Sequence, residues 1–264
     1  MSAILLLKLF LVPILIYTIT MVGRKWGPTV AGWMSAFPIV AGPILLVFSL
    51  EHGAQFGTQA AQGTLLAVLA VLVFNLSFVW ASAKFKIAGT LASSLGAWAL
   101  ALLGLRPVQL GPELCFVLVL GALLIAPHLF PHPPVRSADL HPSPNDLPWR
   151  MLLALLLVLM VTFLAAQLGP RMSGFLAMFP VMSTVLAGFS LHYSGRAFTV
   201  ALLRGIVFGY FSFATFCIVL IELLPAHAIA MAFLGAFGCA LLVQIAVKFV
   251  LIHASKLRRK KTAR

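Results

Sequence analysis

The sequence is poor in charge, and above all in acidic residues. Its 264 residues include five Asp and Glu against 18 Lys and Arg, and charged residues make up 9% of the chain. Ordinary soluble domains carry about 25% charged residues. Hydrophobic residues make up 62%, and the mean hydropathy is +1.11. We therefore expect lipid to be the solvent and the fold to be an all-α membrane protein, because helices satisfy their own backbone hydrogen bonds.

Residues that build disulfides, metal centres and catalytic sites are also scarce. The three cysteines, Cys115, Cys217 and Cys239, fall inside apolar runs without paired spacing, so we expect no disulfide. His128 and His132 are separated by Pro131, which breaks the helical spacing of metal ligands. No nucleophile–base–acid set or glycine-rich phosphate loop occurs. The sequence thus predicts no metal, no cofactor and no enzymatic activity.

The chain does contain long apolar runs, which are bounded by Gly, Pro and charged residues. They predict nine transmembrane helices, at residues 3–22, 28–50, 59–80, 87–105, 113–130, 150–168, 172–192, 198–221 and 227–252. The polar, proline-rich stretch 131–149 is the one linker that we expect. We divide the chain into a first four-helix copy (1–106), a linking helix and loop (107–149), a second copy (150–252) and a basic tail (253–264).

The two copies are related by a constant offset of 142 residues. Seven Gly and Pro residues of the first copy meet the same residue in the second: Gly27, Pro28, Gly32, Pro38, Gly53, Gly63 and Gly96. Because Gly and Pro report backbone geometry, we expect the copies to share one fold. An odd number of helices between equivalent positions would turn the second copy over, giving a 4+1+4 inverted repeat.

Charge predicts the orientation of the chain. If alternate loops lie on opposite sides, thirteen basic residues fall on one side: Arg24, Lys25, Lys84, Lys86, Arg136, Arg150, Arg196, Lys256, Arg258, Arg259, Lys260, Lys261 and Arg264. Three fall on the other, namely Lys8, Arg106 and Arg171. The basic side is expected to be cytoplasmic, with the N-terminus outside. Basic residues beside apolar runs favour anionic lipids as partners of the tail, and nucleic acid is not an expected partner.

Several short motifs support a family resemblance. The second copy contains G-F-L-A-M-F-P (residues 174–180), H-Y-S-G-R-A (192–197) and L-R-G (203–205), and the first contains G-W-M-S-A-F-P (32–38) and E-H-G (51–53). These stretches resemble the GlpM family of small bacterial inner-membrane proteins, whose members are similar to one four-helix copy. The resemblance implies a bacterial inner membrane and a link to the cell envelope, without naming a substrate. A fused pair of copies departs from the family's pattern.

Prolines and buried polar residues mark the candidate site. Prolines inside two predicted helices free backbone carbonyls, as in transporters with midplane sites, although a simple kink is the alternative. The candidate substrate-binding residues are Pro38, Gly42, Pro43, Gln62, Asn75, Pro180, Ser183, Thr184 and Arg204. Arg204 either points into the bundle near Ser183 and Thr184 or reaches along its helix to the cytoplasmic headgroups.

Two functions remain open on these grounds. A transporter or channel-like protein would carry a neutral or anionic small solute, because no acid falls deep within a predicted helix to accept a cation. The alternative is a non-transporting scaffold for assembly of an envelope polymer. Convergent polar groups around both prolines would favour the first, and a dry, closed centre would favour the second.

Overall fold

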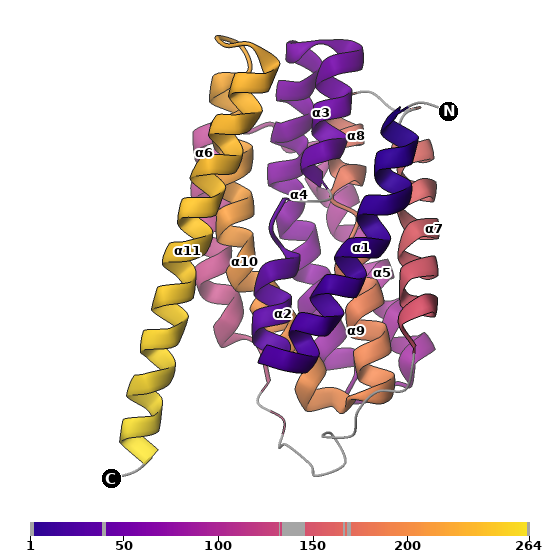
Figure 1. Ribbon diagram of the computed structural model, residues 1–264, viewed down its shortest axis with the longest axis vertical. Coiled ribbons are helices and arrows are strands. Elements are labelled where there is room, and N and C mark those ends of the chain that lie inside the picture. Colours follow the sequence, from indigo (N-terminus) through magenta and orange to yellow (C-terminus); the bar gives the residue numbers. More distant parts are fainter. Residues whose placement is uncertain are drawn as a thin grey trace.

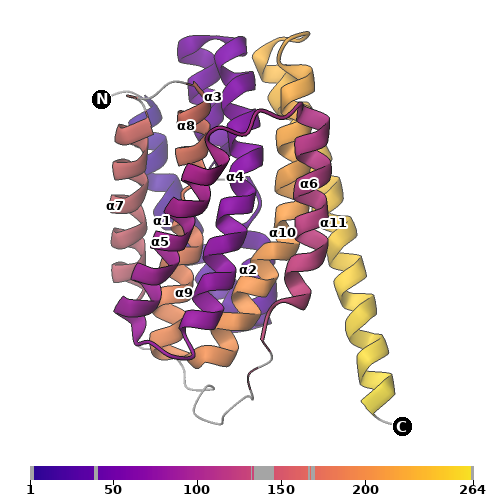
Figure 2. The ribbon, with the colours of Figure 1, turned by 180° about the vertical axis from the view of Figure 1, so that it is seen from behind.

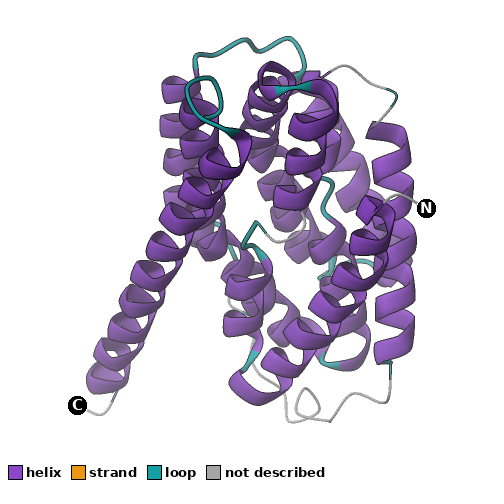
Figure 3. Cartoon of the chain, turned by 45° about the horizontal axis from the view of Figure 1, so that its top comes forward, coloured by secondary structure: helices purple, strands orange, loops and turns teal. Residues whose placement is uncertain are grey.

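The computed structural model is helical throughout the part of the chain that it describes, which comprises residues 3–38, 41–131, 133, 146–165, 167 and 170–262. Side chains are described for fewer residues, and those of the basic tail (253–264), of Lys8 and of most of the linker lie outside them. Figure 3 shows helices joined by loops and no strand in the drawn elements. The all-α prediction is confirmed.

Helices of the first half are α1 (Ala3–Trp26), α2 (Pro28–Ser35), α3 (Ala41–His52), α4 (Ala54–Ala81) and α5 (Ile87–Leu105). Next come α6 (Pro112–Ile125) and the 3-10 turn η1 (Ala126–His128). The second half contains α7 (Leu147–Ala165), α8 (Pro170–Ala177), α9 (Val181–Tyr193), α10 (Gly195–Leu223) and α11 (Ile229–Thr262).

The largest differences from the prediction lie in three of the helices. The single helices expected at 28–50 and 172–192 are each divided into a short helix and a longer one, because Pro38 and Pro180 lack the N–H that would continue the ladder. The last helix extends ten residues beyond its predicted end at 252, to Thr262. Lys and Arg are good helix formers, and no Gly or Pro interrupts that segment.

Five segments are long and apolar enough to cross a bilayer: Ala54–Ala81, Ile87–Leu105, Pro170–Tyr193, Gly195–Leu223 and Ile229–Val250. Shorter apolar helices lie at Ala41–His52, Pro112–His128 and Leu147–Val161. Large apolar side chains on the outer faces are exposed, as with Leu100 (71%) on α5 and Leu234 (73%) on α11. Such faces suit contact with lipid tails, so the chain is a multi-pass helical membrane protein.

Helix bounds recur along the chain with the offset of 142. Helices α2 and α8 begin at residues 28 and 170, α5 and α11 begin at 87 and 229, and α4 and α10 end at 81 and 223. Helix α4 descends through the bundle in Figure 1, whereas α10, whose end lies 142 residues after that of α4, ascends. Gly53 and Gly195, which precede α4 and help to begin α10, both have positive φ, 89° and 80°. A residue with a Cβ would be strained there.

Close helix crossings involve equivalent glycines. At Gly32 of α2, a Cβ would overlap the Leu202 carbonyl of α10, and at Gly174 of α8 it would overlap the Ala60 carbonyl of α4. Residues 32 and 174 are 142 positions apart, and so are residues 60 and 202, so the two crossings involve residues at the same offset. Small residues there let backbones approach, which drives helix association in membranes.

Candidate functional site

The two helix breaks line one cavity near the middle of the bundle. Its volume is about 50 Å³. In Figure 2, the break between α8 and α9 lies behind α4 and α5, inside the bundle. The lining comes from both breaks and from α10, with Ser35, Ala36, Phe37, Ala41, Ala177, Met178, Phe179, Pro180, Val181, Met182, Ser183, Tyr210 and Phe213. Segments that are 142 residues apart therefore meet at one place.

The local backbone explains how the second break is made. Pro180 has φ −74° and ψ 52°, close to an inverse γ-turn, and Val181 N donates to the Phe179 carbonyl at 2.7 Å. Helix α9 then starts with Thr184 N donating to the Pro180 carbonyl at 2.8 Å. The first break is similar in that Gly42 N donates to the Pro38 carbonyl at 3.0 Å. Each proline thus lies in the break between two helices, and its carbonyl accepts a hydrogen bond from the first turn of the second helix.

Polar side chains converge on this cavity. Ser183 is 1% exposed, and its Oγ has no hydrogen bond of good geometry within the described residues, although the Tyr210 hydroxyl faces it. Across the cavity, Ser35 Oγ donates to the Gly32 carbonyl at 2.8 Å. Ser183 and Tyr210 therefore place two hydroxyl groups at the cavity, where they can bond to each other, to a ligand or to water.

The structure brings two of the predicted site residues, Pro180 and Ser183, into the lining. Pro38 is buried within the first break, and Gly42 packs against Phe237 from the first turn of α3, which also contains Pro43. Thr184, one residue after Ser183, lines a different, largely apolar groove with Leu91 of α5 and Leu153 of α7. These positions follow from the helical rotation of about 100° between neighbours.

Gln62 lies elsewhere, in a polar cavity of about 510 Å³ at the end of the bundle where α5 leads into α6. Its lining is Gln59, Gln62, Gln109, Leu110 and Arg171. Gln62 Nε2 donates to the Leu110 carbonyl at 2.7 Å, and Arg171 donates to the Val108 carbonyl. Both long side chains therefore hold the α5–α6 connection in place.

Asn75 and Arg204 are not among the residues that line the central cavity. Asn75, on α4, is fully buried, and neither its amide oxygen nor its amide nitrogen has a hydrogen-bond partner within the described chain. Arg204, on α10, is half-buried. The predicted site residues thus occupy several separate places in the bundle.

Sequence reasoning missed a buried cluster of charge at the other end of the bundle. Arg150 Nε and a second guanidinium nitrogen donate to Asp146 Oδ2 at 2.8 and 2.6 Å, and Arg24 donates to Asp146 Oδ1 at 3.3 Å. The Asp146 side chain is 1% exposed. The i, i+4 spacing of Asp146 and Arg150 was a visible signal. The contact with Arg24, on α1, spans 122 residues and has no sequence signature.

Comparisons with known proteins found no match among family models, curated proteins or solved structures. The resemblance to the GlpM family stays a prediction that rests on the short motifs quoted above.

Proposed function

We propose that the chain is a transporter or channel-like protein for a neutral or anionic small solute, with its path between two copies of one four-helix unit. The observation that carries this proposal is the cavity to which both helix breaks contribute. Broken helices expose backbone groups at mid-depth, and such groups are tolerated in a membrane where they line a cavity. Ser183 and Tyr210 supply side-chain polarity beside them.

The inverted repeat is part of the same proposal. It is supported by the equal offset of helix bounds, by the opposite directions of α4 and α10 (Figure 1), and by the reciprocal glycine contacts of α2 and α8. Reporter fusions at Leu110 and at Asp139 test it. They should report opposite sides of the membrane, and a report from the same side would contradict inversion.

The chemistry of the buried acids supports a neutral or anionic solute. Glu51, Glu113 and Glu222 are exposed. Asp146 is buried, but both of its oxygens accept hydrogen bonds from arginines. Asp139 lies outside the described residues. Cation-coupled carriers keep a carboxylate within the membrane to bind and release the ion.

A scaffold for envelope-polymer assembly is the second candidate. The size of the cavity favours it, because 50 Å³ holds no more than a few water molecules. On the transport proposal, α3 or α9 must shift to widen the cavity enough to admit a solute. Flux measurement separates the two functions.

The test uses proteoliposomes loaded with a mixture of small polyols, sugars, carboxylates and phosphates, with solute loss followed by mass spectrometry. The Ser183→Cys variant, in a background with Cys115, Cys217 and Cys239 changed to alanine, allows the cavity to be blocked after folding by a charged methanethiosulfonate. Leu100→Cys, on the exposed face of α5, is the matched control. We expect reagent to stop flux through the first variant and to leave the second unchanged.

If every compound is lost from the proteoliposomes no faster than from protein-free liposomes, the transport proposal is contradicted and the scaffold proposal remains. Flux that is unaffected when Ser183→Cys is labelled would place the path elsewhere. The Arg204→Lys and Arg204→Gln variants then test selectivity. Guanidinium offers a planar donor fork that Lys lacks, so both changes should lower anion flux if Arg204 faces the path.

A further inference from the structure

The polar cavity at the end of the bundle where α5 leads into α6 has the size of a ligand site. Its volume of about 510 Å³ lies within the range of about 300–1,000 Å³ that is usual for small-molecule sites. It shares no lining residue with the central cavity. In Figure 2, the α5–α6 connection runs near the top of the bundle, past α4, to α6. The chain therefore forms a larger cavity away from the helix breaks.

Arg171 brings to this cavity a positive charge without a carboxylate partner. The residue is half-buried, its guanidinium donates to the Val108 carbonyl, and its Cζ lies 5.6 Å from the centroid of the Phe175 ring. No carboxylate comes within ion-pair distance of it in the part of the chain that the structure describes. Since a guanidinium group has five N–H donors, most of them stay available to an acceptor that enters the cavity.

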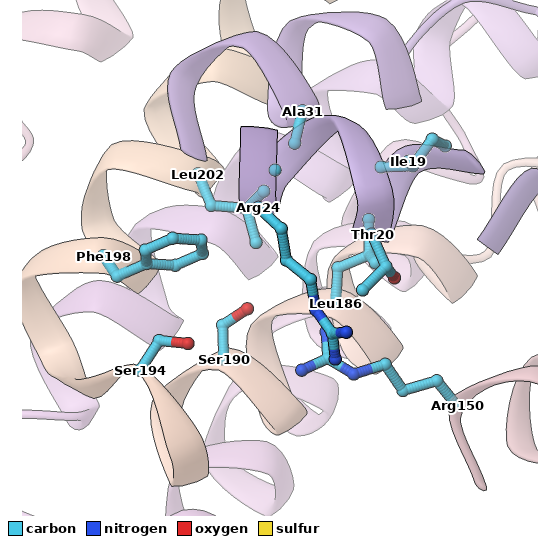
Figure 4. Close-up of a pocket in the computed structure, with 11 residues that line it drawn as sticks. Ile19, Thr20, Arg24, Ala31, Arg150, Leu186, Ser190, Ser194, Phe198 and Leu202 are labelled. Carbon is cyan, nitrogen blue, oxygen red and sulfur yellow. The ribbon is translucent and has the colours of Figure 1, made fainter. Parts of the chain in front are cut away.

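The arginines at the opposite end of the bundle differ in this respect. There, a smaller pocket of about 30 Å³ lies between Arg24 and Arg150, and Figure 4 shows both side chains entering it. Both arginines donate to the buried carboxylate of Asp146. Arg171 has no such counterpart among the described acids, so the anionic group of a bound molecule would complement its charge.

Three carboxamide groups line the cavity together with this charge. Gln62 Nε2 donates to the Leu110 carbonyl at 2.7 Å, so the amide oxygen of Gln62 remains as an acceptor. Gln59 and Gln109 are exposed, and their side chains make no hydrogen bond within the described residues. Carboxamides both donate and accept, as hydroxyl groups do. The lining thus offers donors to an anionic oxygen group and both donors and acceptors to hydroxyl groups.

We propose that this cavity binds a hydroxylated organic anion of about monosaccharide size, with its carboxylate or phosphate on Arg171 and its hydroxyl groups on Gln59, Gln62 and Gln109. The volume sets the size, because it holds roughly ten or more water molecules. A lipid headgroup can have the same chemistry, but its acyl chains need an apolar surface, and Leu110 is the one apolar residue of the described lining. The occupant is therefore a free solute. The site goes beyond the proposed function, since it lies apart from the central cavity and binding there needs no transport.

Binding is tested with the full-length protein in an uncharged detergent, by saturation-transfer difference NMR of added gluconate. Sorbitol, which has the hydroxyl groups without the charge, and acetate, which has the charge without the hydroxyl groups, are the matched probes. We expect dissociation constants for both that are at least roughly tenfold higher than for gluconate, since each lacks one set of hydrogen bonds. Absence of gluconate binding, or gluconate binding no tighter than that of either probe, would overturn the proposal.

Variants of the lining locate the binding. Gln59→Ala and Gln109→Ala should each raise the gluconate dissociation constant roughly threefold to tenfold, because each removes hydrogen bonds to the ligand and none within the described chain. Gln55→Ala, one turn earlier on α4 and outside the lining, is the matched control and should leave the constant unchanged. Arg171→Gln should raise it at least roughly tenfold while sorbitol binding stays the same, which a general loss of folding would not produce. Gluconate binding at the wild-type level in these three lining variants would overturn the proposal.

Nanodiscs separate a free solute from a lipid headgroup. Phosphatidylglycerol has a headgroup that is itself a hydroxylated anion, and phosphatidylserine has the same net charge without those hydroxyl groups. Equal gluconate binding in discs that contain one or the other lipid supports the free solute. Weaker binding with phosphatidylglycerol alone would overturn it in favour of the lipid headgroup.

Discussion

The two ends of the bundle are built from equivalent residues and yet differ in how they are filled. At the offset of 142, the pairs are Phe48 with Ser190, His52 with Ser194 and Phe56 with Phe198. In the first copy, three rings pack together: Phe56 lies 5.7 Å from Phe48 and 4.6 Å from His52, measured between ring centroids. In the second copy, the two serines leave room for the pocket between Arg24 and Arg150.

On the proposed inverted repeat, this difference separates the parts of the repeated unit that are fixed from the parts that are free to diverge. The crossings of α2 on α10 and of α8 on α4 use equivalent glycines against backbone atoms, where no other residue fits. The ends of the helices make side-chain contacts, which tolerate exchange of a ring for a hydroxyl and a charge. The backbone contacts therefore preserve the fold, while the ends acquire separate chemistry.

The largest effect on stability is expected when the end of the bundle that contains the ring cluster is changed to resemble the end that contains the pocket. Phe48 is 4% exposed, and Phe48→Ser, which installs the residue of its counterpart Ser190, removes a ring from the core. Comparable core truncations cost about 3–5 kcal/mol. Unfolding in mixed micelles of SDS and detergent should show a loss of this order. Phe85→Ser, at a ring that is 55% exposed, is the control and should cost far less. Equal losses would mean that the ring cluster does not close this end.

The second prediction concerns the close helix crossings at Gly32 and Gly174. Gly32→Ala and Gly174→Ala should each lower the free energy of unfolding by about 1–3 kcal/mol, because the added methyl meets a backbone carbonyl that cannot move aside. Gly96→Ala and Gly238→Ala, also an equivalent pair, have nothing within 4 Å and should be neutral. A large loss of stability at one crossing and none at the other would mean that the two crossings are not equivalent.

Much of the fold was predictable, because the lengths of the apolar runs indicate the helices and the positions of Gly and Pro indicate where they are interrupted. The helix at 87–105 was predicted with its observed bounds, and the interruptions at Pro38 and Pro180 followed from proline chemistry. The sequence left open whether each proline breaks its helix or only kinks it, and the structure divides each span into two helices.

The sites were harder to predict because they depend on contacts between distant segments. Ser183 was identified from its place after Pro180, and it lines the cavity. Thr184 was grouped with it by proximity in sequence, but helical rotation turns it to another groove. The pairing of Arg24 with Asp146 depends on how α1 packs on α7, which no local pattern reports.

The smallest expected effect lies at the crossing of α4 on α8, where the copies differ by one hydrogen bond. Thr64 Oγ1 lies 2.8 Å from the Ala60 carbonyl of its own helix and 3.0 Å from the Gly174 carbonyl of α8, so it shares one proton between them, whereas its counterpart on α10 is Ile206. Thr64→Val keeps the shape and removes the hydroxyl. Interhelical hydrogen bonds in membrane proteins contribute on average about 0.6 kcal/mol, so the loss should be of that size.

Thr58→Val on the same helix is the matched control, because its hydroxyl bonds to the Ala54 carbonyl of α4 itself. Both variants should be compared by unfolding in the same mixed micelles. A loss that is larger for Thr64 than for Thr58, and far smaller than for Gly174→Ala, would mean that close backbone approach holds this crossing and the hydrogen bond only adds to it. If Thr64→Val costs as much as Gly174→Ala, the two crossings are stabilised differently, because Ile206 cannot replace that bond at the other one.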